Sequence, residues 1–241
     1  MIFGAPPIVT NGLVLSLDAG NSKSYPGSGT TWSDLSGNRN TGTLTPGASG
    51  LTFNRDGGGS LVFDGTDDYI NIPASATTAF TGTNYTISVW VKLSSIHSSQ
   101  YSAIVSRFGP TTNYQGYAIE ASNNTGSNKF AFLAGSANTF NRVFSDSTII
   151  FNKWYNLVGT SQSNVLRFYI DSVIQSTTVN QATTTTANVN LKLGRYYDEV
   201  AYATQFLLVG SLANTQIYNR ALTSSEVQQN YNALKSRFNL S

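Results

Sequence analysis

The sequence has no cysteine among its 241 residues. This absence excludes a disulfide framework, a thiol nucleophile and a thiolate metal site. Charged residues are also scarce, at 11% with a formal net charge of +2. The sequence therefore lacks the basic patch of a nucleic-acid-binding protein and any acidic tail, and we expect no nucleic-acid partner.

Long apolar runs are absent as well, since no stretch reaches membrane-spanning length. Residues 1–12 lack the basic start and sustained apolar core of a secretory signal peptide, and they contain Pro6 and Pro7. Either the chain is made and used without export or a signal has been removed, and Met1 favours the first. We expect no membrane insertion and an extended N-terminal arm over residues 1–12.

Acid–base and metal-binding side chains are few. The three glutamates, Glu120, Glu199 and Glu226, are far apart in the sequence, whereas a retaining glycosidase needs two carboxyl groups roughly 5 Å apart. The single histidine, His97, lies in a polar stretch without a nucleophile motif, which favours a solvated loop residue over a serine–histidine site. These absences predict that the chain is not an enzyme.

Alternating hydrophobicity is the main pattern that the sequence does contain. In residues 85–93 every second side chain is apolar, which is the period-two pattern of a strand with one buried face. Residues 165–170 and 189–193 have the same pattern. Shorter strands are expected at 13–17, 102–106, 116–120, 129–133, 142–145 and 155–159. Many short strands separated by turns predict an antiparallel β-sandwich.

Two loops have distinct signals. Asp64-Gly65 lies between the predicted strands 61–63 and 69–72, and Asp-Gly between apolar strands predicts a β-hairpin. Residues 21–50 are rich in Gly, Ser, Thr and Asn, which predicts a long ordered loop anchored by Trp32 and Leu35.

One helix is expected, over residues 224–237. Thr223 and Glu226 form a capping box at its start, and Leu222 and Val227 have the spacing of a hydrophobic staple. Apolar residues then recur at helical spacing as far as Phe238.

Two segments bracket the predicted sandwich, GSLVFDGTDDYINIP at residues 59–73 and IYNRALTSSEVQQNYNAL at 217–234. Between them lie TISVWVKL, GYAI, KWYNLVGT and LRFYIDS, in that order. With these segments the chain resembles the laminin-G-like jelly rolls of the concanavalin A-like lectin/glucanase superfamily. The resemblance implies an all-β fold of two packed antiparallel sheets over residues 13–241, with one short C-terminal helix.

The resemblance also suggests calcium, because members of this superfamily frequently bind it near a loop-bearing edge. Asp18, Asp64, Asp67 and Asp68 are the candidate ligands, since calcium takes oxygen ligands. The alternative is that Asp64 shapes the turn while Asp67 and Asp68 cap backbone amides around it.

Glycan binding requires aromatic faces together with amide and hydroxyl groups. Loop aromatics with polar neighbours are therefore the candidates, and each has a structural alternative as a loop anchor or core cap. The candidate residues are Trp32, Asn113, Tyr114, Arg195, Tyr196 and Tyr197.

Three further segments resemble structural proteins of tailed bacteriophages, particularly marine ones: VLSLDAGN at 14–21, SYPGSGTTWSDLSG at 24–37 and QQNYNALKSRF from Gln228. The resemblance implies a non-enzymatic virion surface protein, as a capsid decoration, fibre or appendage component. Its N-terminal arm would contact other virion proteins, its loops would face host-surface polysaccharide, and it would form a homo-oligomer in the particle.

Two alternatives to the virion interpretation remain. One is a secreted extracellular carbohydrate-binding module or glycoside hydrolase of a bacterium, with the same fold. The other is a purely structural assembly module without a ligand.

Overall fold

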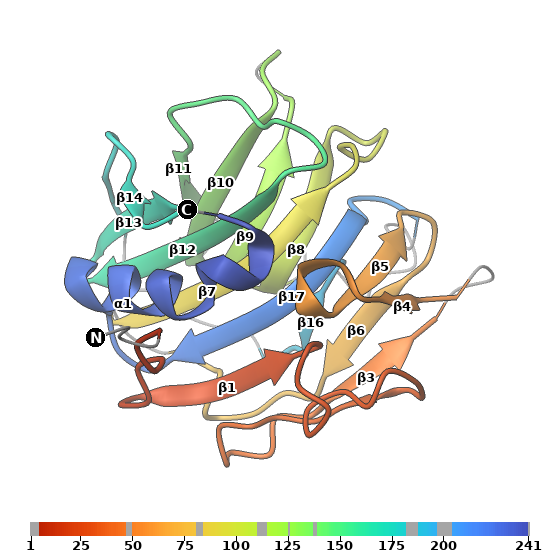
Figure 1. Cartoon of the computed structure of the whole chain (residues 1–241). Coiled ribbons are helices and arrows are strands. Elements are labelled where there is room, and N and C mark those ends of the chain that lie inside the picture. Colours follow the sequence, from red (N-terminus) through yellow and green to blue (C-terminus); the bar gives the residue numbers. More distant parts are fainter. Residues whose placement is uncertain are drawn as a thin grey trace.

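Two antiparallel sheets pack face to face in the computed structural model (Figure 1). It describes residues 5–46, 50–80, 84–109, 115–124, 126–136, 139–181, 188–196 and 204–240. Sheet A has nine strands, in the order β14 (Val173–Ile174), β13 (Val165–Ile170), β12 (Trp154–Gln162), β7 (Tyr85–Leu93), β17 (Val209–Tyr218), β5 (Ser60–Asp64) and β4 (Thr52–Asn54), with β1 (Leu13–Asp18) paired to β17 and β15 (Val179–Asn180) paired to β13. The predicted all-β sandwich is confirmed.

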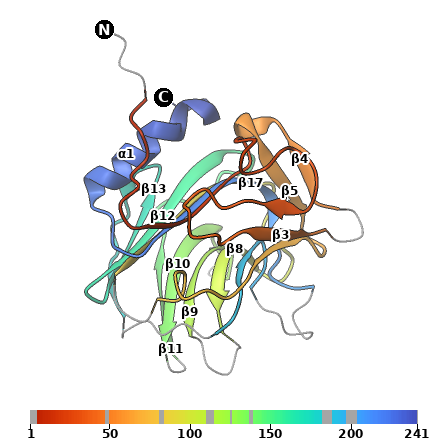
Figure 2. The ribbon, with the colours of Figure 1, turned by 90° about the horizontal axis from the view of Figure 1, so that it is seen from below.

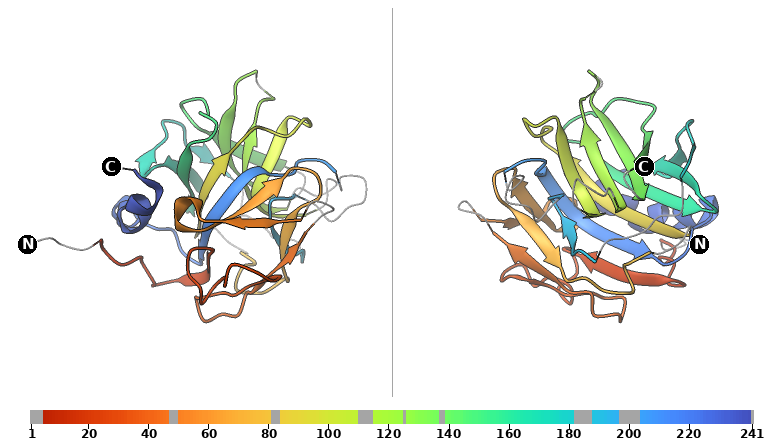
Figure 3. Two further views of the ribbon diagram at one scale, coloured as in Figure 1. Left: turned by 45° about the vertical axis from the view of Figure 1, so that its right-hand side comes forward. Right: turned by 180° about the vertical axis from the view of Figure 1, so that it is seen from behind.

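Sheet B forms the second layer. It has eight strands, in the order β11 (Thr139–Phe144), β10 (Lys129–Ser136), β9 (Gly116–Ser122), β8 (Tyr101–Phe108), β16 (Leu191–Leu193), β6 (Tyr69–Ile72), β3 (Gly42–Thr45) and β2 (Thr31–Trp32). Viewed from behind, β8, β9 and β10 run side by side across this layer (Figure 3).

The main hydrophobic core lies between the two sheets. Ile87, Val89 and Val91 on β7 point into it and have no exposed surface, whereas Trp90 belongs to a separate cluster on the outer face of sheet A. The predicted alternation of β7 is therefore confirmed. It also shows that both faces of the strand are covered, since Trp90 is buried as well.

The Asp64-Gly65 turn does not form a hairpin, so that prediction was wrong. On one side of the turn β5 pairs with β17 and β4 in sheet A, and on the other side β6 pairs with β16 and β3 in sheet B. Gly65 has a φ of 80°, which permits the sharp reversal. The local sequence thus specifies a turn, but distant strands decide how its two flanks pair.

The C-terminal helix covers the outer face of sheet A (Figure 2). Helix α1 (Ser224–Leu234) begins with the predicted capping box of Thr223 and Glu226 and continues into the 3-10 helix η3 (Lys235–Phe238). The Phe238 ring stacks on Trp90 at 4.0 Å between centroids. No helix of the described residues is both long and apolar enough to cross a membrane.

The described part of the N-terminal arm, from residue 5, docks on the same chain. The Val9 amide donates to Asn230 Oδ1 at 2.7 Å, and the Tyr218 hydroxyl donates to the Val9 carbonyl at 3.0 Å. The Gln229 side chain donates to the Pro7 carbonyl at 2.8 Å. The arm is thereby fixed against α1 and the end of β17.

The segment 21–50 is anchored differently from the prediction. Trp32 is fully buried in the main core, as expected of an anchor, but Leu35 is 40% exposed and is held through its backbone, whose amide donates to the Ser16 carbonyl at 2.9 Å. The segment also contains β2 and β3, because residues 31–32 and 42–45 extend sheet B at its edge.

Candidate functional site

A row of small residues crosses the outer face of sheet B, the face turned away from the main core. Gly116 on β9 lies opposite Phe108 on β8 and opposite Gly135 on β10, and Gly135 lies opposite Phe140 on β11. Directly paired residues point to the same face of a sheet. The two phenylalanines flank two positions without side chains, and their rings meet edge-to-face with 6.4 Å between centroids.

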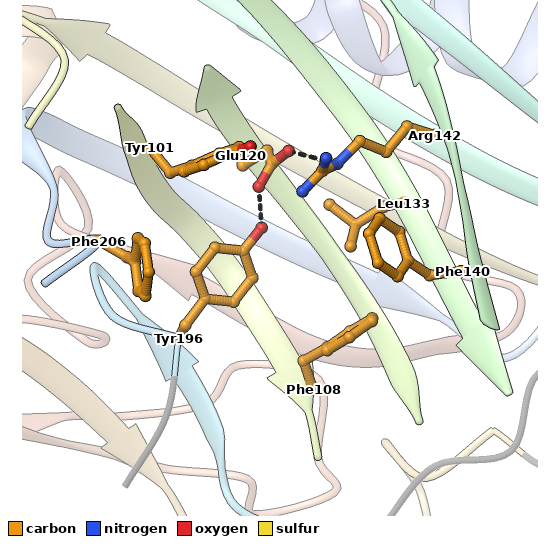
Figure 4. A pocket seen from close by; sticks show the side chains of 8 residues that line it. All are labelled: Tyr101, Phe108, Glu120, Leu133, Phe140, Arg142, Tyr196 and Phe206. Carbon is orange, nitrogen blue, oxygen red and sulfur yellow. Dashed lines mark hydrogen bonds and ion pairs between the residues drawn. The ribbon is translucent and has the colours of Figure 1, made fainter. Parts of the chain in front are cut away.

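Both rings line a pocket of about 200 Å³ (Figure 4). Its lining consists of Tyr101, Phe108, Glu120, Leu133, Phe140, Arg142, Tyr196 and Phe206. Five of these side chains are aromatic, and they come from β8, β11 and the segments that follow β16 and precede β17. The volume is below the roughly 300–1,000 Å³ typical of sites for drug-sized ligands, so it suits one sugar-sized group.

Glu120 lies at the floor of the pocket with no exposed side-chain surface. The Tyr196 hydroxyl donates a short hydrogen bond to Glu120 Oε2, and Arg142 Nε lies 2.8 Å from Glu120 Oε1 (Figure 4). The Arg142 contact is an ion pair without hydrogen-bond alignment, and neither atom has a hydrogen-bond partner among the described residues. Buried polar atoms in proteins are normally satisfied, and these two meet each other as an ion pair.

Burial and charge shift the pKa values of this pair. Burial raises the pKa of the Glu120 carboxyl, while Arg142 and Tyr196 oppose the rise only partly. Burial also lowers the pKa of Arg142, but attraction to Glu120 outweighs it and the net direction is upward. Each partner thus favours the charged form of the other, with Glu120 lying beneath the guanidinium.

Aromatic rings hold the guanidinium of Arg142. Its Cζ lies 5.2 Å from the centroid of Tyr101 and 4.7 Å from that of Phe140. Such contacts between a cation and aromatic rings are favourable and orient the planar group. The side chain of Arg142 is 22% exposed, so it presents N–H donors toward the mouth of the pocket.

Of the glycan candidates that the structure describes, only Tyr196 lines the pocket. The Arg195 guanidinium instead lies over the ring of Tyr69, at 4.8 Å. Trp32 has no exposed surface and its ring cannot contact a ligand, which corrects that candidate. Asn113, Tyr114 and Tyr197 lie outside the described residues.

The remaining pocket residues were missed from the sequence, although one signal was present. The outward-facing positions of β9 and β10 include Ala118, Leu133, Gly116 and Gly135, where a solvated strand face would carry polar residues. Small and apolar outward positions on adjacent strands indicate a covered or ligand-binding face. The pairing of Glu120 with Arg142 depends on strand order, which the sequence pattern does not specify.

The acidic cluster forms in part as predicted. Ligand oxygens of Asp64, Asp67 and Asp68 lie within 4.8 Å of one another. Asp18 lies apart, in an ion pair with Arg237 at 2.8 Å. Asp18 pairs with Asn214 on β17, whereas Asp64 pairs with Val209 near the start of that strand. The predicted set of four is therefore not brought together.

Two of the clustered carboxylates bind backbone amides. Asp64 Oδ1 accepts from the Thr66 amide at 2.7 Å, and Asp68 Oδ2 accepts from the Asp64 amide at 3.2 Å. These bonds agree with the alternative for two of its three residues, with Asp64 shaping the turn and Asp68 capping a backbone amide. The three carboxylates are oxygen donors of the kind that calcium takes, and calcium binding stays a prediction.

His97 is half-buried rather than fully solvated. Its Nδ1 lies 2.8 Å from Ser99 Oγ, and burial lowers the pKa of its imidazole. Ser99 Oγ also accepts from the Phe206 amide at 3.0 Å. His97 and Ser99 thus hold the segment that carries Phe206 into the pocket.

Residues 64–228 match the profile of the concanavalin A-like lectin/glucanases superfamily, in its Laminin_G_3 form. The match covers more than half of the chain, and the chain belongs to this superfamily. A search of curated protein sequences finds no match.

Several solved structures share the fold. Domain 4 of a GH43 extracellular arabinanase from Geobacillus stearothermophilus, in complex with arabinotriose, is 18% identical, with a TM-score of 0.67 over 91% of this chain and 98% of that one. Trypanosoma rangeli sialidase in complex with sialic acid is 15% identical, with a TM-score of 0.69 over 97% of this chain and 36% of that one. A botulinum neurotoxin type C structure is 12% identical, with a TM-score of 0.67 over 94% of this chain and 52% of that one.

The chain thus spans about a third of the sialidase and about half of the toxin chain. At these identities the likeness shows the fold. It nevertheless corrects the prediction that the chain is not an enzyme, because chains of glycoside hydrolases contain this fold. The lack of a two-glutamate strand motif is therefore no ground for excluding an enzyme.

Proposed function

We propose that the chain binds carbohydrate in the pocket on the outer face of sheet B. One observation carries the proposal: five aromatic side chains surround a buried Glu120–Arg142 ion pair, on a strand face that would otherwise carry solvated polar residues. The proposal concerns binding and does not depend on whether the bound sugar is cleaved.

The pocket supplies both kinds of contact that a sugar requires. The rings of Phe108 and Phe140 offer apolar faces to the C–H groups of a sugar ring. The Arg142 guanidinium offers N–H donors, and the Tyr101 hydroxyl can donate or accept. A planar arrangement of donors bordered by aromatic walls suits a small polyhydroxylated ring.

Three of the similar structures are described with a carbohydrate or a glycolipid as a ligand of that protein, which supports a carbohydrate ligand here. The arabinanase domain is in complex with arabinotriose, the sialidase is in complex with sialic acid, and cell entry of the neurotoxin is described as dependent upon interaction with two ganglioside molecules. For this chain these ligands are support by analogy of fold, and they do not locate the site.

As the biological setting we propose a bacteriophage virion surface, on the sequence resemblance of residues 14–21, 24–37 and the C-terminal segment from Gln228. In this setting the pocket would bind host-surface polysaccharide. Because the arm is fixed from Pro7 onward, contacts to neighbouring virion proteins fall to the residues that precede it. Mass spectrometry of purified particles tests this setting, and absence of the chain from every particle contradicts it.

The binding proposal is tested by filling the pocket. Leu133→Trp places an indole in the space of about 200 Å³, and we expect it to abolish saturation-transfer NMR signals from bound saccharides. Ile150→Trp adds the same group at a position that is 64% exposed, and it should bind like the wild type. Equal binding by all three folded proteins would reject the pocket as the site.

A further inference from the structure

The described lining of the pocket contains one cation and one anion. Arg142 and Glu120 are these two groups, and they lie 2.8 Å apart (Figure 4). Their charges therefore cancel at short range, and a ligand in the pocket meets little net field.

The two charges differ in their access to solvent. The Arg142 side chain is 22% exposed and the Glu120 side chain is 0% exposed. A ligand thus reaches the guanidinium directly, whereas Glu120 acts from beneath it. Tyr196 fixes the carboxylate in this position through its hydroxyl.

An exposed guanidinium without a counter-charge is a strong binder of carboxylates, often through two parallel hydrogen bonds. In this pocket Glu120 already occupies that role. A uronic or sialic acid would therefore bring a second carboxylate close to Glu120 between aromatic walls, where the repulsion is poorly screened. A neutral sugar carries no such cost.

We propose that Glu120 is a specificity-determining residue that masks the charge of Arg142 and makes the pocket selective for neutral over acidic sugars. The inference rests on the proposed carbohydrate binding. It assigns Glu120 a role in discrimination, exerted through Arg142 rather than through contact with the ligand.

The test is a glycan array of neutral and acidic oligosaccharides at pH 8, probed with wild type, Glu120→Gln and Asp146→Asn. Glutamine keeps the shape of Glu120 and can still accept the Tyr196 hydrogen bond, but it removes the negative charge. Asp146→Asn removes one negative charge at a site bonded to Ser176, away from the pocket. It therefore controls for the change in net charge.

We expect wild type and Asp146→Asn to bind neutral glycans and to leave acidic ones unbound. Glu120→Gln should gain acidic glycans, shifting the ratio of uronate to isosteric uronamide affinity by about ten-fold or more toward the uronate. Strongest wild-type binding to acidic glycans, or an unchanged ratio in folded Glu120→Gln, would overturn the inference while carbohydrate binding stands. Binding of no glycan by wild type would remove the proposed function itself.

A failure of Glu120→Gln to fold leaves the wild-type comparison as the deciding measurement. Titration of wild type with the uronate and the uronamide of one hexose changes only the ligand charge. Tighter binding of the uronamide supports the inference, and equal or tighter binding of the uronate overturns it.

Discussion

Tyr196 donates its hydroxyl hydrogen to Glu120 and thereby ties the segment after β16 to the middle of β9. Its ring also packs edge-to-face against Phe108 at 6.4 Å and against Phe206 at 5.9 Å between centroids. One side chain thus positions the carboxylate at the floor of the pocket and two of its aromatic walls.

Tyr196→Phe tests this role, because it removes the hydroxyl and keeps the ring. The buried Glu120 then loses its hydrogen-bond donor, and we expect the free energy of unfolding to fall by about 1–3 kcal/mol. Tyr25→Phe is the matched control, since its hydroxyl donates at 3.0 Å to the Gly29 carbonyl elsewhere in the fold. Chemical denaturation of the three proteins measures the effect. If both variants lost the same free energy of unfolding, the Tyr196 hydroxyl would contribute no more than an ordinary tyrosine hydroxyl.

The capping box predicts a dependence of stability on pH. Glu226 receives the Arg220 guanidinium at 2.6 Å and the Thr223 amide at 2.9 Å. The Arg220 hydrogen bonds, with those from Thr223, lower the pKa of Glu226 to about 2. A lowered carboxyl pKa stabilises the fold above the unfolded value near 4.5, and this contribution is lost as the pH falls from there toward 2.

Glu226→Gln should therefore be less stable than wild type at pH 7, and the difference should shrink as the pH falls from about 4.5 to 2. Thermal unfolding across this range measures both proteins. A difference that stays constant over the range would show that the Glu226 charge contributes nothing to the cap.

The docking of the N-terminal arm depends on Asn230. Its amide accepts from the Val9 amide at 2.7 Å and donates to the Tyr218 hydroxyl at 2.9 Å, within the fold. Asn230→Leu leaves the Val9 amide and the Tyr218 hydroxyl without this partner, and we expect the free energy of unfolding to fall by about 1–3 kcal/mol. Limited proteolysis should then cleave the arm faster than in Gln228→Leu, a change on the exposed side of α1. Equal cleavage rates would mean that the arm is held by other contacts.

The turn between β13 and β14 holds two non-glycine residues in the left-handed region. Asp171 and Ser172 have φ values of 50° and 66°, where Asn-Gly or Asp-Gly is favoured. Ser172→Gly should raise the free energy of unfolding by up to about 1 kcal/mol. Ser225→Gly, in the first turn of α1, should lower it by about 0.5 kcal/mol instead. If Ser172→Gly lowered the free energy of unfolding instead, the positive φ of Ser172 would not be a source of strain.

Period-two patterns, together with shorter strand segments between turns, were sufficient to predict most of the strands. Residues 85–93 and 165–170 form β7 and β13, and the predicted helix start at Thr223 is the observed one. The partners of β5 and β6 were not predictable, because an Asp-Gly turn specifies a reversal of the chain and leaves the sheet assignment to distant β17 and β16.

The pocket was less predictable than the fold. Glu120 and Arg142 belong to strands separated by β10, and they meet only because β9, β10 and β11 lie side by side with the observed register. Trp32 illustrates the opposite error, since an aromatic residue in a polar segment can be a core anchor rather than a ligand contact. Local patterns identify residue types for a site, and tertiary pairing decides which of them meet.

The most direct measurement is a crystal structure of the protein with the neutral saccharide that it binds best. We expect a sugar ring in the pocket, in contact with the rings of Phe108 and Phe140, with a hydroxyl within about 2.7–3.2 Å of the Arg142 guanidinium. A saccharide bound elsewhere, beside the Asp64–Asp68 turn or on the 21–50 segment, with the pocket holding only water, would contradict it.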